Sequence, residues 1–255
     1  ITLCFNHVKN KEVIKMKINE LKNWGHVKGG KKSTGTTKPI IIPKKDERLA
    51  ELVGIILGDG NIHIFKGEKS TSYMVRIAGD SNKDKEYLTS YVKVLCDSLF
   101  GIESKLFKHK SHNELFVNIY SKKVVEFLIS IGMHPGNKIN NQVTIPKWIL
   151  DNHSYIKACI RGLVDTDGSI YELKPHWPGL WQICFTNKNE ALLIDFKYGL
   201  TKVGINCSNI YKYKNGKNAP KIYITKKSEL SKFYKEIGFS NPKHRNKLQP
   251  RGVVD

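Results

Sequence analysis

The sequence predicts a mixed α+β fold built from two similar halves, and three observations carry this prediction. Two nonapeptides, LVGIILGDG at residues 52–60 and IRGLVDTDG at residues 160–168, place glycine and aspartate at the same positions. Each ends an apolar stretch with helical periodicity, and each is followed by the same order of strand and helix patterns. Period-two alternation in the strands separates an apolar face from a polar one. We therefore expect two pseudo-symmetric αββαββα repeats.

The first 45 residues are predicted to form a basic arm. They hold eleven lysines and two glutamates, a net charge of +9, and include the run GGKKSTGTTKP. This composition is typical of a solvated segment, with at most a short helix around residues 11–24. The whole chain of 255 residues carries a net charge of +20, which favours a polyanionic partner and nucleic acid above all. The alternative is that lysine is abundant throughout the source proteome.

Composition also excludes several classes of protein. No stretch approaches the roughly 18 apolar residues of a membrane span, and the N-terminal sequence lacks the apolar region of a secretory signal. Five cysteines without a CxxC pair argue against a disulfide framework and against a structural zinc site. We therefore expect an intracellular protein with reduced thiols, in an organelle or in prokaryotic cytoplasm, and no membrane partner.

The predicted domain organisation follows from the repeat and from Pro146, which interrupts regular structure between the halves. It consists of the basic arm at 1–45, a first repeat at 46–140, a linker at 141–153, a second repeat at 154–248 and a tail at 249–255.

The helices and strands of the two repeats are expected at matching positions. Asp46 is a suitable N-cap for an apolar helix that Gly60 closes, and Ser154 and Gly168 take the same places in the second repeat. In both repeats 13 residues separate the N-cap from the aspartate of the nonapeptide. A strand, a polar turn and an amphipathic helix follow, and then a strand that runs into a further helix. The sequence SNPKH at 240–244 is interpreted as a loop that closes the second half.

Alternation within the strands predicts which face of each sheet is buried. The expected core positions are Val75, Ile77, Leu115, Val117, Ile119, Ile183, Phe185, Ile222 and Ile224. The other face is basic, amide-rich and aromatic, which suits phosphate contacts and readout of base edges in a wide groove. The residues predicted to bind DNA are Arg76, Lys105, Lys108, Asn118, Gln182, Thr186, Lys212, Lys214, Lys221 and Tyr223. The alternative is an ordinary solvated sheet face.

Glycine within an apolar helix needs a structural reason, because it costs about 0.5 to 1 kcal/mol relative to alanine. A missing Cβ permits close backbone approach, so we expect the two nonapeptide helices to pack against each other at Gly54 and Gly162. Asp59 and Asp167, each five residues further on, then arrive together at one end of the helix pair.

Two carboxylates at the C-terminal ends of helices are unfavourable unless a cation is present. Carboxylates, backbone carbonyls and water suit Mg²⁺, which can activate water for phosphodiester cleavage. The alternative is that each aspartate only shapes the turn at Asp-Gly.

The paired nonapeptides resemble the signature of the LAGLIDADG homing endonucleases, in the single-chain form with two copies. The similarity extends in motif order and spacing over roughly residues 46–248. The resemblance implies motif helices at the central interface, an antiparallel β saddle that grips double-stranded DNA, and a monomer with pseudo-twofold symmetry. It implies a site-specific, intron-encoded endonuclease that cuts both strands of a long asymmetric target and leaves 3′ overhangs.

The resemblance also implies site residues. Asp59 and Asp167 are the implied metal ligands, assisted by the carbonyls of Gly58 and Thr166. The implied ion is Mg²⁺, with Mn²⁺ as a substitute and Ca²⁺ supporting binding without cleavage. Polar residues after the second and fourth strands are added to the catalytic set by repeat position: Asp80, Asn187, Lys122 and Lys227, with Lys123 or Lys226 as alternatives for the lysines.

Two other functions stay open on the same fold. One is a DNA-binding regulator that has lost cleavage, against which the intact Asp59 and Asp167 weigh. The other is a maturase that acts on its own intron RNA. An intein host is disfavoured because neither splicing junction is visible. His109 and His112 have a spacing found in metal sites, but without a third ligand they are interpreted as phosphate-contacting or solvated side chains.

Overall fold

The computed structural model describes residues 39–68, 70–213 and 218–248, all within the compact unit Pro39–Asp255. The expected helix around residues 11–24, Lys214 and the tail at 249–255 lie outside the described residues. The described residues of the predicted basic arm, 39–45, contact both repeats. Two contacts show this: the Ile41 N–H donates to the Phe100 carbonyl at 2.8 Å, and the Tyr155 hydroxyl donates to the Lys45 carbonyl at 2.7 Å.

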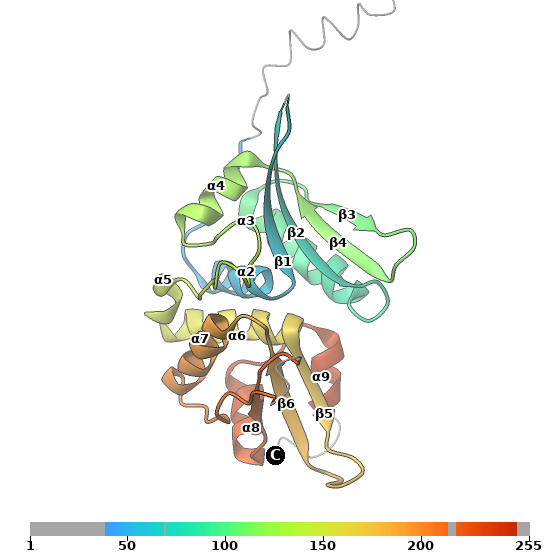
Figure 1. Cartoon of the computed structure of the whole chain (residues 1–255), viewed down its shortest axis with the longest axis vertical. Coiled ribbons are helices and arrows are strands. Elements are labelled where there is room, and N and C mark those ends of the chain that lie inside the picture. Colours follow the sequence, from blue (N-terminus) through green and yellow to red (C-terminus); the bar gives the residue numbers. More distant parts are fainter. Residues whose placement is uncertain (1–38, 69, 214–217, 249–255) are drawn as a thin grey trace, which may run out of the picture. The chain divides into compact units, whose positions relative to one another are not determined.

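The first repeat has the predicted order of helices and strands (Figure 1). Its elements are α2 (Glu47–Gly58), β1 (Gly60–Lys66), β2 (Thr71–Asp80), the π-helical turn η1 (Tyr87–Val92) running into α3 (Lys93–Phe100), β3 (Lys105–Lys108), β4 (Glu114–Ile119) and α4 (Lys122–Ser130). The strands form one antiparallel sheet in the order β1-β2-β4-β3. The αββαββα prediction is confirmed for this half.

The second repeat follows the same order with two differences. The strand expected before β7 is almost absent, and a helix, α9, follows α8. After α5 (Lys147–Leu150) in the linker, its elements are α6 (His153–Asp167), β5 (Gly168–Glu172), β6 (Trp181–Thr186), α7 (Glu190–Lys202), β7 (Lys221–Ile224), α8 (Lys227–Glu236) and α9 (Pro242–Leu248). The antiparallel sheet has the order β5-β6-β7. The partner strand expected before β7 is reduced to one bridge between Tyr211 and Lys221.

The helix α9 overturns the interpretation of residues 240–244 as a loop. The Asn241 side chain accepts from the Lys243 N–H at 3.1 Å, and the Asn241 carbonyl accepts from the His244 N–H at 3.0 Å. Asparagine before a helix and proline at its first position are both favourable, because Asn supplies an acceptor and Pro has no N–H to satisfy. The order Asn-Pro is therefore a helix start here.

The predicted helix ends are right in two cases and wrong in two. Gly168 is the C-cap of α6, as expected. Asp46 is the N-cap of α2, with Oδ1 accepting from the Leu49 N–H at 2.8 Å. Ser154 is not the N-cap of α6, because Asn152 takes this place and accepts from the Ser154 and Tyr155 N–H groups. Gly60 does not close α2, which ends at Gly58 with Asp59 as its C-cap, and it begins β1 instead.

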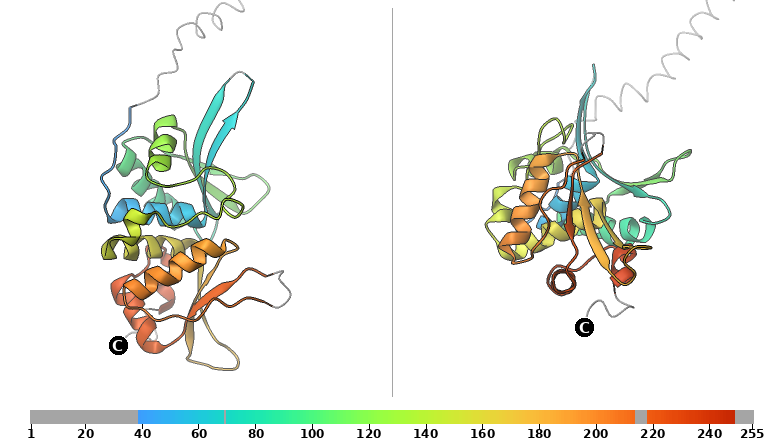
Figure 2. Two further views of the ribbon diagram at one scale, coloured as in Figure 1. Left: turned by 60° about the vertical axis from the view of Figure 1, so that its left-hand side comes forward. Right: turned by 60° about the horizontal axis from the view of Figure 1, so that its bottom comes forward.

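The core is continuous across both repeats because α2 and α6 lie side by side between the two sheets (Figures 1 and 2). The apolar side chains of both motif helices are buried, from Leu49 to Leu57 and from Ile156 to Val164. All nine predicted core positions in the strands are buried, so the strand-face prediction is confirmed. Among the described residues, none of the helices combines the length and the apolar character that a bilayer-spanning segment requires.

Candidate active site

The glycines of the two motif helices bring the helix backbones together. A Cβ on Gly54 would lie 3.1 Å from the Cys159 Cα, and a Cβ on Gly162 would lie 2.8 Å from the Ile55 nitrogen. Neither side chain could be added without moving a neighbouring backbone, so the predicted role of both glycines agrees with the packing of α2 on α6.

The same packing places the two aspartates together where the helices end. Asp59 is the C-cap of α2 and Asp167 is the last residue of α6. A Cβ on Gly58 would lie 3.6 Å from Asp167 Oδ2, so the end of the first motif helix directly abuts the carboxylate of the second. The side chain of Asn187 donates to Asp167 Oδ2 at 2.7 Å, which places this predicted residue in the site.

Both carboxyl groups hold their protons more tightly than usual. The pKa of Asp167 is raised to about 7, first by burial and then by the nearby charge of Asp59. Burial also raises the pKa of Asp59. Desolvation and mutual repulsion both disfavour the ionised pair, and a bound cation would relieve both.

Lys138 is a residue of this site that the sequence analysis missed. Its ammonium group donates to the carbonyls of Ile56 at 3.3 Å, Leu57 at 2.9 Å and Gly58, the last residues of α2. Burial lowers the pKa of Lys138, and the charges of Asp167 and Asp59 act in the opposite direction. The lysine therefore brings a positive charge to the C-terminal end of the first motif helix, where the helix dipole favours it.

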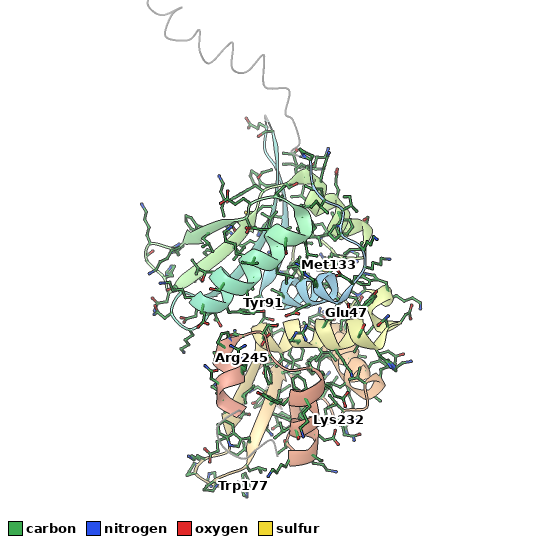
Figure 3. All side chains as sticks on the ribbon, turned by 180° about the vertical axis from the view of Figure 1, so that it is seen from behind. Glu47, Tyr91, Met133, Trp177, Lys232 and Arg245 are labelled. Atoms are coloured by element: carbon green, nitrogen blue, oxygen red, sulfur yellow. The ribbon has the colours of Figure 1, made fainter. Side chains whose placement is uncertain are left out.

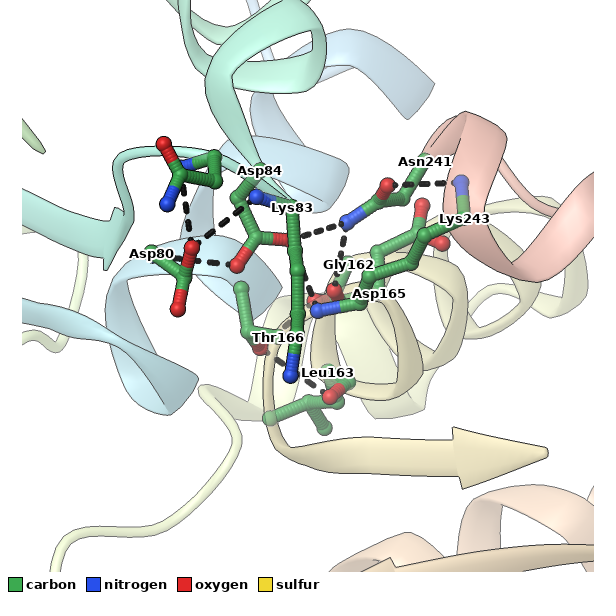
Figure 4. Close-up of polar contacts among 10 residues, drawn as sticks. Asp80, Lys83, Asp84, Gly162, Leu163, Asp165, Thr166, Asn241 and Lys243 are labelled. Carbon is green, nitrogen blue, oxygen red and sulfur yellow. Dashed lines mark hydrogen bonds and ion pairs between the residues drawn. The ribbon is translucent and has the colours of Figure 1, made fainter. Parts of the chain in front are cut away.

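Lys243 on α9 is the second missed lysine. It acts electrostatically on both aspartates, and its ammonium group lies 2.7 Å from Asp84 Oδ1 (Figure 4). The repeat itself contains the signal for both lysines. Ile131-Gly132-Met133 is followed by Lys138 in the first repeat, and Ile237-Gly238-Phe239 is followed by Lys243 in the second.

The lysines nominated from repeat position contact other groups. The Lys122 Nζ lies 3.6 Å from Glu126 Oε1 and 5.7 Å from the centre of the Tyr73 ring. Lys227 is the exposed first residue of α8. The charges that act on Asp59 are those of Lys138, Lys243 and Asp84. The structure thus brings Lys138 and Lys243, rather than the predicted Lys122 and Lys227, close enough to act on the paired aspartates.

Asp80 lies at the edge of the site rather than at its centre. Its Oδ1 accepts from the backbone N–H groups of Asn82 and Lys83, which lowers the pKa of Asp80. The carboxylate thus shapes the turn after β2, as aspartate commonly does.

The donors present fit a hard divalent cation. Asp59 and Asp167 supply carboxylate oxygens, and the Gly58 carbonyl, which accepts from Lys138, lies at the same helix end. The hydroxyl of Thr166 donates back to the Gly162 and Leu163 carbonyls, so only its carbonyl is a candidate ligand. No group of three or more His, Cys, Asp or Glu side chains suited to a metal occurs in the described part of the chain. An ion here would complete its shell with carbonyls and water, as Mg²⁺ commonly does.

A cleft of about 280 Å³ opens beside Asp167. Gly58, Lys138, Asn187 and Lys188 line it, together with Thr186. A second hollow of about 400 Å³ shares Lys188 with the cleft and also contains Lys212. A chain of phosphates could follow these cations away from the carboxylates.

The polar face of the first sheet is arranged around Arg76. The Arg76 Nε donates to Asn118 Oδ1 at 3.1 Å, and the guanidinium lies 4.8 Å from the centre of the Phe116 ring. Asn118 is buried, so it orients Arg76 instead of presenting its own amide. Lys105 pairs with Asn118 in the register and shares this face, whereas Lys108 pairs with the core residue Leu115. Lys108 therefore lies on the opposite face of the strand from Lys105, and its predicted contact with DNA stays a prediction.

The second sheet carries a matching row of polar and aromatic groups. Gln182 accepts from the Tyr171 hydroxyl at 2.7 Å and donates to Thr225 at 2.8 Å. Thr186 pairs with Lys221, and Tyr223 pairs with Cys184, on the face that Gln182 occupies. Lys212 instead forms an ion pair with Glu190 at 2.6 Å.

Comparisons with known proteins agree with this architecture. A family model described as a LAGLIDADG-like domain matches residues 154–238. The replication factor C small subunit of Methanocaldococcus jannaschii is 29% identical over 219 residues, which is 84% of this chain and 11% of that protein. The reverse gyrase of the same organism is 31% identical over 178 residues, 68% of this chain and 9% of that protein. The chain thus spans about a tenth of the length of these two relatives.

Solved structures share the fold at low sequence identity. The homing endonuclease I-DmoI in complex with DNA and Ca superimposes with a TM-score of 0.58 and 21% identity, covering 80% of this chain and 97% of I-DmoI. The LAGLIDADG homing endonuclease I-LtrWI bound to target DNA gives a TM-score of 0.52 and 12% identity, covering 79% of this chain and 87% of that one. Residues 154–238 thus match the model of a LAGLIDADG-like domain, and the chain shares the fold of single-chain LAGLIDADG homing endonucleases, with both motif helices in one chain.

Proposed function

We propose that the chain is a site-specific DNA endonuclease that uses a divalent metal to hydrolyse both strands of a long, asymmetric duplex target and leaves 3′ overhangs. The observation that carries the proposal is the pair of half-buried carboxylates, Asp59 and Asp167, at the end of the crossing helices, with the charges of Lys138 and Lys243 acting on both. Related folds solved with DNA and with Mn, Ca or Mg support a metal-dependent nuclease.

Each residue of the site has a separate role in the proposed reaction. Asp59 and Asp167, with the nearby carbonyls, would hold the metal, and Mg²⁺ bound there supplies an activated water and charge neutralisation at the phosphate. The ammonium groups of Lys138 and Lys243, whose charges act on both aspartates, would offset the negative charge that increases on the attacked phosphate. Asn187 donates to Asp167 and so fixes the orientation of that carboxylate.

A protein that binds DNA without cleaving it would gain no affinity from the paired carboxylates. Two half-buried carboxylates lower affinity for an anionic duplex and also destabilise the fold, since their ionisation is disfavoured. The cleavage function explains why both are present. An additional activity on intron RNA stays a prediction.

The test compares Asp59→Asn and Asp167→Asn with Asp151→Asn, an exposed control at the end of α5. Each aspartate variant should lose Mg²⁺-dependent cleavage by orders of magnitude, and duplex affinity in Ca²⁺ should be retained or increased because negative charge is removed. The target is found first by selecting cleavable sites from a randomised duplex library in Mg²⁺. Wild-type rates in both variants would refute the paired-carboxylate mechanism, and a short palindromic target would contradict recognition by two unlike repeats.

A further inference from the structure

Asp84 connects the two repeats beside the paired carboxylates. It is buried and belongs to the turn after β2 in the first repeat. Its Oδ1 accepts from Asn241 Nδ2 at 3.0 Å and lies 2.7 Å from Lys243 Nζ, and both partners belong to the second repeat. Its Oδ2 accepts from the Asp80 backbone N–H at 3.1 Å. Figure 4 shows the carboxylate between these groups.

Asn241 fixes the geometry of this contact. Its side chain is fully buried, donates also to the Asp165 carbonyl at 3.2 Å, and accepts from the Lys243 N–H at 3.1 Å. The backbone of Lys243 is thus held by Asn241, and its ammonium group is held by Asp84. A free lysine side chain samples many rotamers, so this second anchor places the charge in advance.

The other lysine of the site is held differently. Lys138 donates to the last carbonyls of α2 and has no need of a carboxylate to place it. The corresponding residue of the second repeat is Asn189, the N-cap of α7: its carbonyl accepts from the Leu193 N–H as the Asp84 carbonyl accepts from the Leu88 N–H, and its side chain carries no charge. Lys243 is held near the paired carboxylates by an ion pair with Asp84, whereas Lys138 is held by backbone carbonyls.

We propose that Asp84 is a positioning residue, which holds the Lys243 ammonium beside Asp59 so that one of the two strand cuts depends on Asp84 and the other does not. This rests on the endonuclease function proposed above. Asp84 acts through Lys243 and does not itself contact the phosphate. Its negative charge also acts on Asp59, so a purely repulsive role would give the opposite result, faster cleavage on its removal.

The experiment follows both strands of a labelled duplex target in Mg²⁺ for four proteins: wild type, Asp84→Asn, Lys243→Met and the double variant. Asp84→Asn should slow one strand by about tenfold to hundredfold, the range typical of groups that orient a functional side chain, and nicked duplex should accumulate. In the Lys243→Met background the same change should have no further effect, because residues that act as one unit are non-additive.

Two variants separate positioning from folding. Asp97→Asn removes a carboxylate that lies 2.5 Å from Lys93 in the same repeat, and it should leave both strand rates unchanged. Asp84→Glu keeps the charge and should recover part of the lost rate, even if Asp84→Asn lowers the melting temperature. Equal slowing of both strands, additive losses in the double variant, or faster cleavage by Asp84→Asn would each overturn the proposal. Failure of the wild type to cut at all would instead refute the endonuclease function.

Discussion

Adding one methyl group at the helix crossing should destabilise the protein, although alanine favours helices. In Gly162→Ala the new Cβ would lie 2.8 Å from the Ile55 nitrogen and 3.2 Å from the Gly54 carbonyl carbon. Both atoms belong to the backbone of α2 and cannot rotate away. Helix propensity gains about 1 kcal/mol, and overpacking of this kind costs about 1 to 3 kcal/mol or more. Because relief requires separation of two buried helices, we expect a net loss of about 2 kcal/mol.

Gly199→Ala in α7 is the matched control. A Cβ there would meet Ile156 Cγ2 and Ile160 Cδ1, each at 3.2 Å. Both are side-chain atoms rather than backbone: Ile160 Cδ1 is the free end of its side chain, and Ile156 Cγ2, which is bonded to Cβ, needs to shift by only a few tenths of an ångström. The propensity gain should then be retained in part, and the expected change lies between zero and a stabilisation of about 1 kcal/mol.

Urea unfolding of the two variants in chelator measures both free energies directly. For a chain of this size each kcal/mol also shifts the melting temperature by about 2 to 4 °C. If Gly162→Ala were as stable as Gly199→Ala, close backbone contact would not be the reason for glycine in the motif helices.

Three further predictions concern charge. Since the native pKa of Asp167 is raised from 3.8 to about 7, the native state binds more protons than the unfolded chain between these values, and stability falls as pH rises through them. In chelator, Asp167→Asn should gain stability relative to the wild type from pH 4 to pH 7, by less than about 4 kcal/mol because the residue is only partly buried; a difference independent of pH would contradict this. Duplex affinity should fall by orders of magnitude between about 50 and 200 mM salt, which filter binding or fluorescence anisotropy would show; salt-insensitive binding would exclude the basic sheet faces as the contact surface. Lys221→Met should weaken binding to all duplexes alike, whereas Arg76→Met, which removes the group held by Asn118, should relax base preference at one position in a binding-site selection.

The sequence alone was sufficient for the repeat order and the buried strand faces. Val75 and Ile77 in β2, like Ile222 and Ile224 in β7, alternate with polar residues, and period two leaves only one choice of face. The role of Gly54 and Gly162 was also predictable, because few reasons other than close packing explain glycine within an apolar helix.

Other features depend on contacts that a local pattern does not contain. One error is local: the Asn152 side chain accepts from the Ser154 and Tyr155 N–H groups, so α6 begins two residues earlier than the repeat spacing predicts. Asn118 is polar and was assigned to an open face, yet it is buried where β4 lies between two strands and bonds to Arg76. Figure 3 shows the side chains that surround α2 and α6, including Tyr91 beside this central pair. Such partners come from elements 40 or more residues apart, as in the Tyr91 to Glu51 hydrogen bond.

The two motif helices have the same residue where their backbones pack together. They have different residues where a side chain must hydrogen-bond to a neighbouring segment. Gly54 and Gly162 are matched, but the buried Leu57 of the first motif corresponds to Asp165 in the second. Burial raises the pKa of Asp165 to about 8, and its Oδ2 accepts from the Ser240 N–H at 2.8 Å, directly before α9. This aspartate therefore anchors the segment that carries Lys243. Lys138 is anchored by helix-end carbonyls and needs no such partner, so leucine at position 57 leaves the first lysine in place.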